Sequence, residues 1–312
     1  MNTSKTKKTS KTKKTSKTKK TSKTKKTSKT TTKIIKQTTL TPTNEPKIHP
    51  KNTLNDLNGR EWLKFLKSWY VFDAIKSDLN EEREITKDSD DHPATFSPTM
   101  IEGFVNFFTK KNMTVLDPFA GIGSTLVACD RNDRKGIGIE LNPKYVSIIK
   151  KRISKNQKIL KKDASKISKL KLPEIDFCIN SPPYWNMLHK IDTNQQNRIK
   201  KGLSTKYSEN TNDLGNIANY EEFMEKLVQI YFQIFDIMKP GKYMVVIVQN
   251  VIMKSVMNPF AWDLAIRLSK KFILKKEKIW CQDHKNLYPF GYPTSWVSNT
   301  HHHYCLVFQK PK

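Results

Sequence analysis

The alternation of short apolar runs with helical segments constrains this chain more than any other feature. Apolar runs at 114–116, 136–141, 158–164, 177–180 and 243–249 predict strands. Apolar residues recur at helical spacing in 98–110, 125–131, 143–154, 220–238 and 259–270. Two further apolar stretches, 272–281 and 304–309, predict a closing pair of strands. The pattern predicts an α/β fold in which a mostly parallel, seven-stranded sheet carries helices on both faces.

The first 50 residues differ in composition from the rest. Residues 3–26 are four copies of Thr-Ser-Lys-Thr-Lys-Lys, and no position of this repeat is apolar. Such a segment cannot bury a core, so we expect a disordered basic tail and linker over 1–50. Of the formal net charge of +28, the 15 lysines of residues 1–44 contribute +15 and leave +13 on the remainder. This excess indicates a polyanionic partner, although a merely solubilising tail is an equal alternative for the repeats.

Residues 51–91 predict a helical segment that packs on the main domain. Apolar and aromatic residues recur at helical spacing over 61–75, which is typical of a core-facing stripe. The main domain is then expected to span 92–312, with a polar, irregular stretch at 186–219. Four scattered cysteines and the lack of a long apolar run favour a reduced, intracellular protein without structural zinc or a membrane span.

Acidic residues and glycines gather where the predicted strands end, and ligands bind at these ends in parallel sheets. Asp117 opens a turn, 117–124, whose glycines allow a ligand to approach the backbone closely. Glu140 closes the next strand, near the spacing from Gly121 at which an acid binds ribose hydroxyls. Asp163 closes the third strand, where a carboxylate can accept from an adenine amino group. A dinucleotide is an alternative ligand, but the turn lacks the complete Gly-x-Gly-x-x-Gly.

A second candidate site follows the apolar run 177–179. Ser181 precedes two prolines there, and Tyr184 follows them. The prolines cannot continue a strand ladder, so they predict a rigid turn with free carbonyl groups. Ser181 Oγ and the Pro182 carbonyl can accept hydrogen bonds from the amino group of a flat ring on which Tyr184 stacks, as for a base flipped out of DNA. A strand-ending turn with a core aromatic is the alternative.

Together these segments resemble the amino-group DNA methyltransferases, which use S-adenosylmethionine to modify N4 of cytosine or N6 of adenine. The resemblance rests on 115–125, 138–143 and 181–184 and runs from about residue 92 to the end of the chain. It implies a Rossmann-like class I methyltransferase fold. It also implies that the turn 117–124 holds the methionine moiety, Glu140 the ribose and Asp163 the adenine, with 92–97 over the methionine end. The expected cofactor-binding residues are Asp117, Pro118, Phe119, Ala120, Gly121, Gly123, Ser124, Thr125, Glu140, Leu141, Asp163, Ala164 and Phe96.

The resemblance further implies that Ser181, Pro182, Pro183 and Tyr184 are catalytic. The serine form of this motif is typical of the cytosine-N4 branch, so we expect N4 methylation of cytosine, with N6 methylation of adenine as the alternative. Accepting both amino N–H bonds favours a pyramidal nitrogen that attacks the methyl group in line, and these bonds strengthen as charge develops. An inactive protein that binds the cofactor and DNA is a third hypothesis.

The order of the motifs departs from many relatives of this sequence type, which carry the catalytic motif first. We expect target recognition to come from 186–219, from 282–300 or from the N-terminal helix, because no separate recognition domain is evident. The expected partners are double-stranded DNA and, in a restriction–modification pair, a cognate endonuclease. The three histidines at 301–303 are interpreted as a polar approach to a strand and not as a metal site, because neighbouring strand residues point to opposite faces.

Overall fold

The computed structural model describes residues 47–72, 78, 96–185, 200, 213–253 and 256–312. The chain divides into two units, Met1–Asn44 and Glu45–Lys312, and all described residues belong to the second. The predicted tail and most of the stretch 186–219 lie outside the described residues, so the predicted domain boundaries stay predictions. No helix among the described residues is long and apolar enough to cross a membrane.

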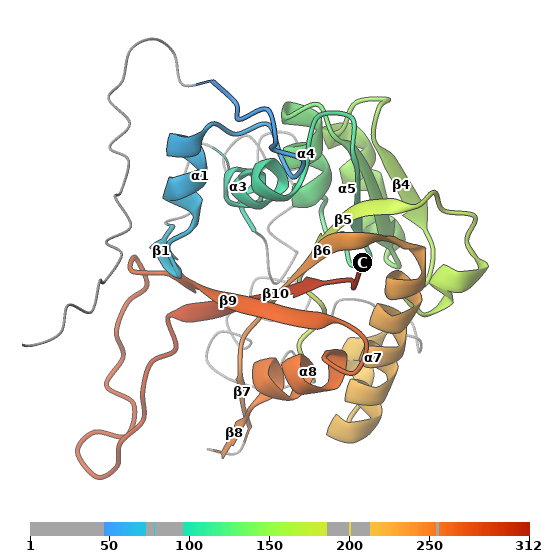
Figure 1. The fold of residues 1–312 in the computed structure, drawn as a ribbon. Coiled ribbons are helices and arrows are strands. Elements are labelled where there is room, and N and C mark those ends of the chain that lie inside the picture. Colours follow the sequence, from blue (N-terminus) through green and yellow to red (C-terminus); the bar gives the residue numbers. More distant parts are fainter. Residues whose placement is uncertain (1–46, 73–77, 79–95, 186–199, 201–212, 254–255) are drawn as a thin grey trace, which may run out of the picture. The chain divides into compact units, whose positions relative to one another are not determined.

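One eight-stranded sheet runs through this unit (Figure 1). Its strands, in spatial order, are β1 (Trp69–Val71), β9 (Ile273–Cys281), β10 (His302–Gln309), β6 (Met238–Val248), β5 (Ile175–Asn180), β2 (Thr114–Asp117), β3 (Lys135–Glu140) and β4 (Lys158–Lys161). The strands from β6 to β4 are parallel, whereas β10 is antiparallel to both β6 and β9. The predicted mostly parallel sheet is confirmed, and β1 adds an eighth strand beside β9.

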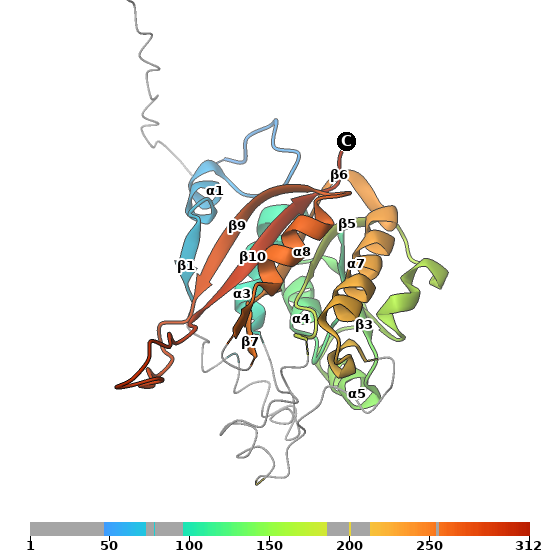
Figure 2. The same cartoon turned by 90° about the horizontal axis from the view of Figure 1, so that it is seen from below.

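Helices cover both faces of the sheet (Figures 1 and 2). One face carries α3 (Pro98–Phe108), α4 (Ser124–Arg131) and α5 (Pro143–Arg152), and the other carries η2 (Ala164–Lys169), η4 (Leu214–Asn216), α7 (Tyr220–Ile237) and α8 (Phe260–Leu268). Alternate residues of the fully buried strand β5 divide the core, because Phe177 packs with α3 while Cys178 packs with α7 and α8. A short hairpin, β7 (Val251–Met253) and β8 (Val256–Asn258), precedes α8. This is the Rossmann-like arrangement that the sequence predicted.

The helix predicted over 61–75 is wrong in its extent. Helix α1 (Gly59–Phe65) begins at Asn58, whose side chain accepts from the backbone N–H of Glu61 in a capping box, and it ends at Phe65. Trp69–Val71 instead forms β1 along the free edge of β9. Lys278 Nζ donates to the carbonyl of Phe65 (2.6 Å) and to that of Lys67, which fixes the end of the helix. The aromatic periodicity could not reveal this partner, because it lies more than 200 residues away in the sequence.

Two other boundaries also differ from the prediction. β4 ends at Lys161, so Asp163 stands two residues beyond the strand and accepts from Ser165 N at the start of η2. Helix α7 ends before the predicted terminator at 239–241, but the chain enters β6 at once, at Met238. The expected strand begins only at 243, because proline and glycine are rare inside strands.

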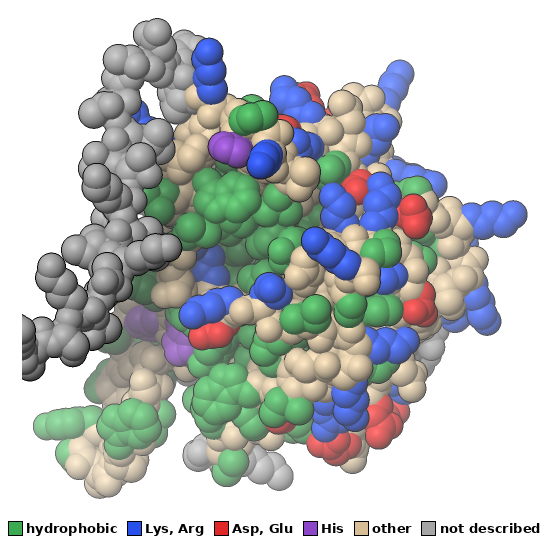
Figure 3. All heavy atoms as spheres, in the orientation of Figure 1, with side chains coloured by type: hydrophobic (Ala, Val, Ile, Leu, Met, Phe, Trp, Pro, Cys, Tyr) green, Lys and Arg blue, Asp and Glu red, His purple; other side chains and the backbone are tan. Residues whose placement is uncertain are grey.

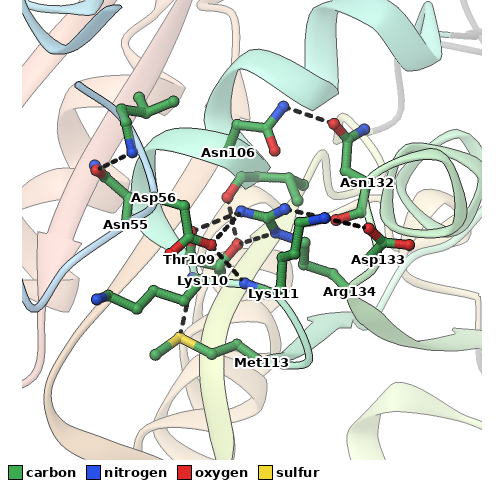
Figure 4. A network of polar contacts seen from close by, with 12 residues as sticks. Asn55, Asp56, Asn106, Thr109, Lys110, Lys111, Met113, Asn132, Asp133 and Arg134 are labelled. Carbon is green, nitrogen blue, oxygen red and sulfur yellow. Dashed lines mark hydrogen bonds and ion pairs between the residues drawn. The ribbon is translucent and has the colours of Figure 1, made fainter. Parts of the chain in front are cut away.

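The amino edge of the sheet, where β2 and β3 begin, is closed by paired polar groups (Figure 4). Arg134, whose side chain is only 5% exposed, donates from Nε to Thr109 Oγ1 (3.0 Å) and from Nη2 to the Thr109 carbonyl (2.9 Å). Asp56 accepts from Lys111 N (2.8 Å) and lies 3.7 Å from Arg134 Nη2. These bonds fasten the N-terminal segment to the end of α3 and the start of β3.

Candidate active site at the carboxyl edge of the sheet

A cavity of about 400 Å³ opens at the carboxyl edge of the sheet, where β2 and β5 end. The strand order reverses here, because β3 and β4 continue on one side of β2 while β5 and β6 continue on the other. Ligands of α/β folds bind in the crevice at such a point. The lining includes all the predicted site residues except Gly123: Phe96, Asp117, Pro118, Phe119, Ala120, Gly121, Ser124, Thr125, Glu140, Leu141, Asp163, Ala164, Ser181, Pro182, Pro183 and Tyr184.

Asp117 holds the loop that follows β2. Its carboxylate accepts from Phe119 N (3.0 Å) and from Thr125 Oγ1 (2.6 Å), so it ties both ends of the turn together. Burial raises the pKa of Asp117 to about 6, although these two hydrogen bonds oppose the shift. Asp117 lines the cavity as predicted, and its hydrogen bonds to Phe119 and Thr125 maintain the shape of the loop.

Gly123 shapes the same loop without lining the cavity. Its φ of +92° lies in the left-handed region, and a Cβ built on it would stand 2.9 Å from Ile149 Cγ1. Helix α4 begins directly after it, so the N–H groups of its first turn point toward the cavity side of the loop. Ser124 Oγ donates to the carbonyl of Phe96 (2.6 Å), which brings the segment before α3 to the loop.

Glu140, at the end of β3, carries a strongly perturbed carboxyl group. It accepts from Gly121 N (2.9 Å) and Asn142 N (2.7 Å). Burial raises its pKa to about 7, and the charges of Asp117 and Asp213 add to the shift. Each oxygen keeps a second lone pair, so the ionised group can still accept from two neighbouring hydroxyls.

The Ser-Pro-Pro-Tyr turn leaves β5 at the same edge. Asn180, the last residue of the strand, is buried and accepts from the Tyr231 hydroxyl (2.6 Å), which anchors the turn to α7. The ring of Tyr184 lies between Phe260 and His303, with centroids 6.1 Å and 6.4 Å away. Ser181 and Tyr184 therefore face the same cavity as the loop of β2, although 57 residues separate Ser124 from Ser181.

Sequence reasoning missed several residues of the cavity wall: Ile101, Ile122, Ile139, Tyr145, Lys162, Asn180, Asp213, Leu214, Ile230, Ile247, Trp280, Gln282, Lys285 and His303. Two of them are unusual, because Gln282 Oε1 and His303 Nδ1 are buried without a hydrogen-bond partner among the residues that the structure describes. His303 stacks on Trp280 (4.7 Å), and burial lowers its pKa to about 3, so the ring is neutral. The sequence could have indicated one of these residues, because alternate residues of a strand face the same side and one of the histidines at 301–303 can therefore face the site. No group of three metal-ligating side chains lies within the described ranges.

Comparison of the sequence with known proteins gives a DNA methylase family and several methyltransferases. The family model that matches is described as DNA methylase (N6_N4_Mtase) and covers residues 2–151, so the match ends before Ser181. The Type II methyltransferase M.BglI of Bacillus subtilis is 33% identical over 115 residues, which are 36% of this chain and 30% of the relative. The Type II methyltransferase M.Cfr9I of Citrobacter freundii is 45% identical over 62 residues, 20% and 21% of the two chains. The chain thus spans less than a third of the length of either relative.

Solved structures share the architecture at low identity. TrmN from Thermus thermophilus aligns with 73% of this chain and 53% of its own, at 14% identity and a TM-score of 0.46. An rRNA methylase from Streptococcus thermophilus aligns with 70% and 99%, at 10% identity and a TM-score of 0.43. Neither similarity bears on the function of this chain.

The strand order and the cavity at its switch point define a Rossmann-like methyltransferase. The chain resembles the amino-methyltransferase family, whose DNA methylase model matches residues 2–151, just under half of its length. S-adenosylmethionine is the cofactor of this family, and the cavity offers groups that fit it. They are a glycine-containing loop for the amino-acid end, a carboxylate at the end of β3 for the ribose hydroxyls, and aromatic rings beside both.

Proposed function

We propose that this protein transfers a methyl group from S-adenosylmethionine to the exocyclic amino group of a base in double-stranded DNA, with N4 of cytosine as the target. One observation carries the proposal: the Ser-Pro-Pro-Tyr turn and the loop after β2 open into a single cavity. A methyl donor and an acceptor amine held there are in contact, so that positioning lowers the barrier.

Ser181 and Pro182 would accept the two N–H bonds of the amino group. The nitrogen lone pair, no longer delocalised into the ring, would attack the methyl group that S-adenosylmethionine supplies. The N–C bond would form as the S–C bond breaks, which leaves S-adenosylhomocysteine, and the methylated nitrogen would then lose one proton to solvent. As the nitrogen becomes positive, its N–H bonds to Ser181 Oγ and the Pro182 carbonyl strengthen, so the transition state gains more than the ground state. Tyr184 would stack on the base, and its ring is held in place by Phe260 and His303.

The cofactor would lie along the loop from Asp117 to Thr125, with Glu140 on the ribose and Asp163 on the adenine. Asp163 lines the cavity and its Oδ1 accepts from Ser165 N, whereas its Oδ2 is 4.0 Å from Lys166 Nζ, beyond hydrogen-bond distance, so Oδ2 can accept from an amino group. Asp117 acts through the loop whose ends it joins. Phe96 covers the methionine end, because its carbonyl is bonded to Ser124.

Duplex DNA as the partner agrees with the charge of +28. The Type II names of the relatives support a place in a restriction–modification pair with a cognate endonuclease. Serine at 181 supports cytosine over adenine, because the family branch that it resembles acts on cytosine N4.

Mass spectrometry of nucleosides tests the proposal. Unmethylated plasmid DNA is incubated with the purified protein and deuteromethyl-labelled S-adenosylmethionine, and Ser181→Ala protein purified in the same way controls for contaminating methylases. Labelled N4-methylcytosine is expected with the wild type alone. Labelled N6-methyladenine would contradict the choice of base while leaving the chemistry intact, and no label in DNA despite cofactor binding would contradict the proposed substrate.

A further inference from the structure

Residues 283–300, within the connection between β9 and β10, expose several large apolar side chains to solvent. We call this segment the aromatic loop. Its exposed residues, with their exposed fractions, are Leu287 (77%), Tyr288 (55%), Phe290 (54%), Tyr292 (82%), Trp296 (89%) and Val297 (42%). The loop extends away from the rest of the unit in both ribbon views, and green side chains cover it in Figure 3. Exposed apolar clusters of this kind mark surfaces that bind a partner.

Hydrogen bonds within the aromatic loop fix its conformation. Asn299 bonds to both backbone groups of Tyr288, accepting from its N–H (3.0 Å) and donating to its carbonyl (2.8 Å). Gly291 has a φ of +78° and accepts from the N–H groups of Thr294 (2.9 Å) and Ser295 (2.7 Å). A Cβ at Gly291 would stand 2.3 Å from the carbonyl oxygen of Ser295. These bonds hold the rings outward in a fixed arrangement, which lowers the entropy lost on binding.

Both ends of the aromatic loop lead into the cavity. Gln282, immediately before it, and His303, three residues after it, line the cavity, and so does Lys285 within it. The base of the aromatic loop is therefore part of the cavity wall, and the exposed rings extend outward from it. A base that leaves the duplex exposes the faces of its two neighbours, and aromatic side chains bind such faces by stacking.

We propose that the aromatic loop stacks on the bases that flank the extruded one and so keeps the duplex open during methyl transfer. Tyr292 and Trp296, the most exposed rings, make these contacts, and Lys285 attracts the nearby phosphates. The inference rests on the proposed function, because it assumes that a base of duplex DNA is the substrate. A second copy of this chain is the competing occupant, since apolar loops also mediate self-association.

The test compares duplex DNA with the same plasmid DNA after heat denaturation, because single strands have no pair to open. The double variant Tyr292→Ala/Trp296→Ala is measured beside Trp262→Ala, which removes a half-exposed tryptophan on α8. We expect kcat/KM on duplex DNA to fall about 10-fold or more in the double variant, and by less than about threefold on denatured DNA. Trp262→Ala should match the wild type on both.

Two results would overturn the inference: an equal loss on duplex and denatured DNA, or no loss on either. Sedimentation that finds a wild-type dimer and a monomeric double variant would assign the loop to self-association instead. If the wild type methylates no DNA, the proposed function fails, and binding then decides the role of the loop. Fluorescence anisotropy would compare a duplex containing one mispaired cytosine with its fully paired form, and the inference fails if the double variant retains the wild-type preference for the mispaired duplex.

Discussion

Two buried glutamines at opposite edges of the sheet have opposite surroundings. Gln157, at the amino edge, accepts from Gly136 N (2.6 Å) and donates to Asp130 Oδ1 (3.1 Å) and to the Arg134 carbonyl (3.0 Å). Gln282, at the carboxyl edge, is equally buried, yet its Oε1 has no hydrogen-bond partner in the described part of the chain. Burying an unpaired acceptor costs free energy, so such a group persists where a ligand completes it. The amino edge is therefore built for stability and the carboxyl edge for binding.

At the carboxyl edge, burial also disfavours the ionised form of two acidic side chains. The pKa of Asp117 and that of Glu140 are both raised by burial, to about 6 and about 7. At the amino edge the Lys111 side chain bonds to Asp133 and lowers the pKa of that carboxyl group. Perturbed groups gather at functional sites, and these follow that rule. Four substitutions or titrations can break or sharpen this contrast.

The largest effect is expected at Ser181. Ser181→Ala removes one acceptor of the amino N–H bonds, so methyl transfer should fall at least about 100-fold while the melting temperature stays unchanged. Ser154→Ala is the matched control at the amino edge, because Ser154 Oγ bonds to Asp130 and lines no part of the cavity. Transfer rates from labelled S-adenosylmethionine and thermal denaturation give the two readings. Comparable rate losses in the two variants would refute the division between the edges.

Gln157→Met should damage stability instead of activity. The change leaves Gly136 N and the Arg134 carbonyl without their partner, so we expect the free energy of unfolding to fall by about 2–4 kcal/mol. Denaturant titration measures this loss. At a temperature where the variant is folded, its kcat should equal that of the wild type. A reduced kcat would show that the amino edge affects methyl transfer.

Cofactor binding should depend on pH through Glu140. Its folded pKa of about 7 means that the ionised form, which accepts from hydroxyl groups, predominates only above that pH. The Kd of S-adenosylmethionine is therefore expected to rise by up to about tenfold per pH unit as the pH falls below 7. Isothermal titration calorimetry between pH 6 and pH 8 tests this, with Glu140→Gln as a variant whose affinity is weaker and independent of pH. A constant wild-type Kd over that range would remove Glu140 from the ribose site.

The smallest effect is expected at Gln282, where a substitution should raise the free energy of unfolding instead of lowering it. Gln282→Met removes a buried Oε1 that has no partner among the described residues and leaves an apolar side chain of similar length, so the free energy of unfolding should rise by about 1 kcal/mol. Methylation of DNA by this variant should be slower, because a polar group of the cavity is lost. Denaturant titration of this variant and of Gln157→Met measures both changes in the free energy of unfolding, one expected to be positive and the other negative. A loss of stability at Gln282 would mean that its amide is satisfied and that the two edges are alike.

The sequence was a good guide wherever a local rule decided the structure. The period of apolar residues located the seven expected strands, and the ends of those strands located the acids and the turn that line the cavity. It was a poor guide to β1, because Trp69–Val71 owes its strand conformation to the distant edge of β9. It also did not place Trp280 at the site, because the position of β9 in the sheet is set by its pairing with β10.

The sequence by itself predicted the Rossmann-like fold, the resemblance to a methyltransferase family and two sets of candidate residues, because each depends on local periodicity or on a short motif. Only the tertiary structure decided that the two sets share one cavity, since the reversal of strand order between β2 and β5 brings their ends together. It also decided that His303 lines that cavity and that the aromatic loop extends from the cavity wall. Strand pairing across the sheet fixes those positions, and pairing is a property of the whole chain.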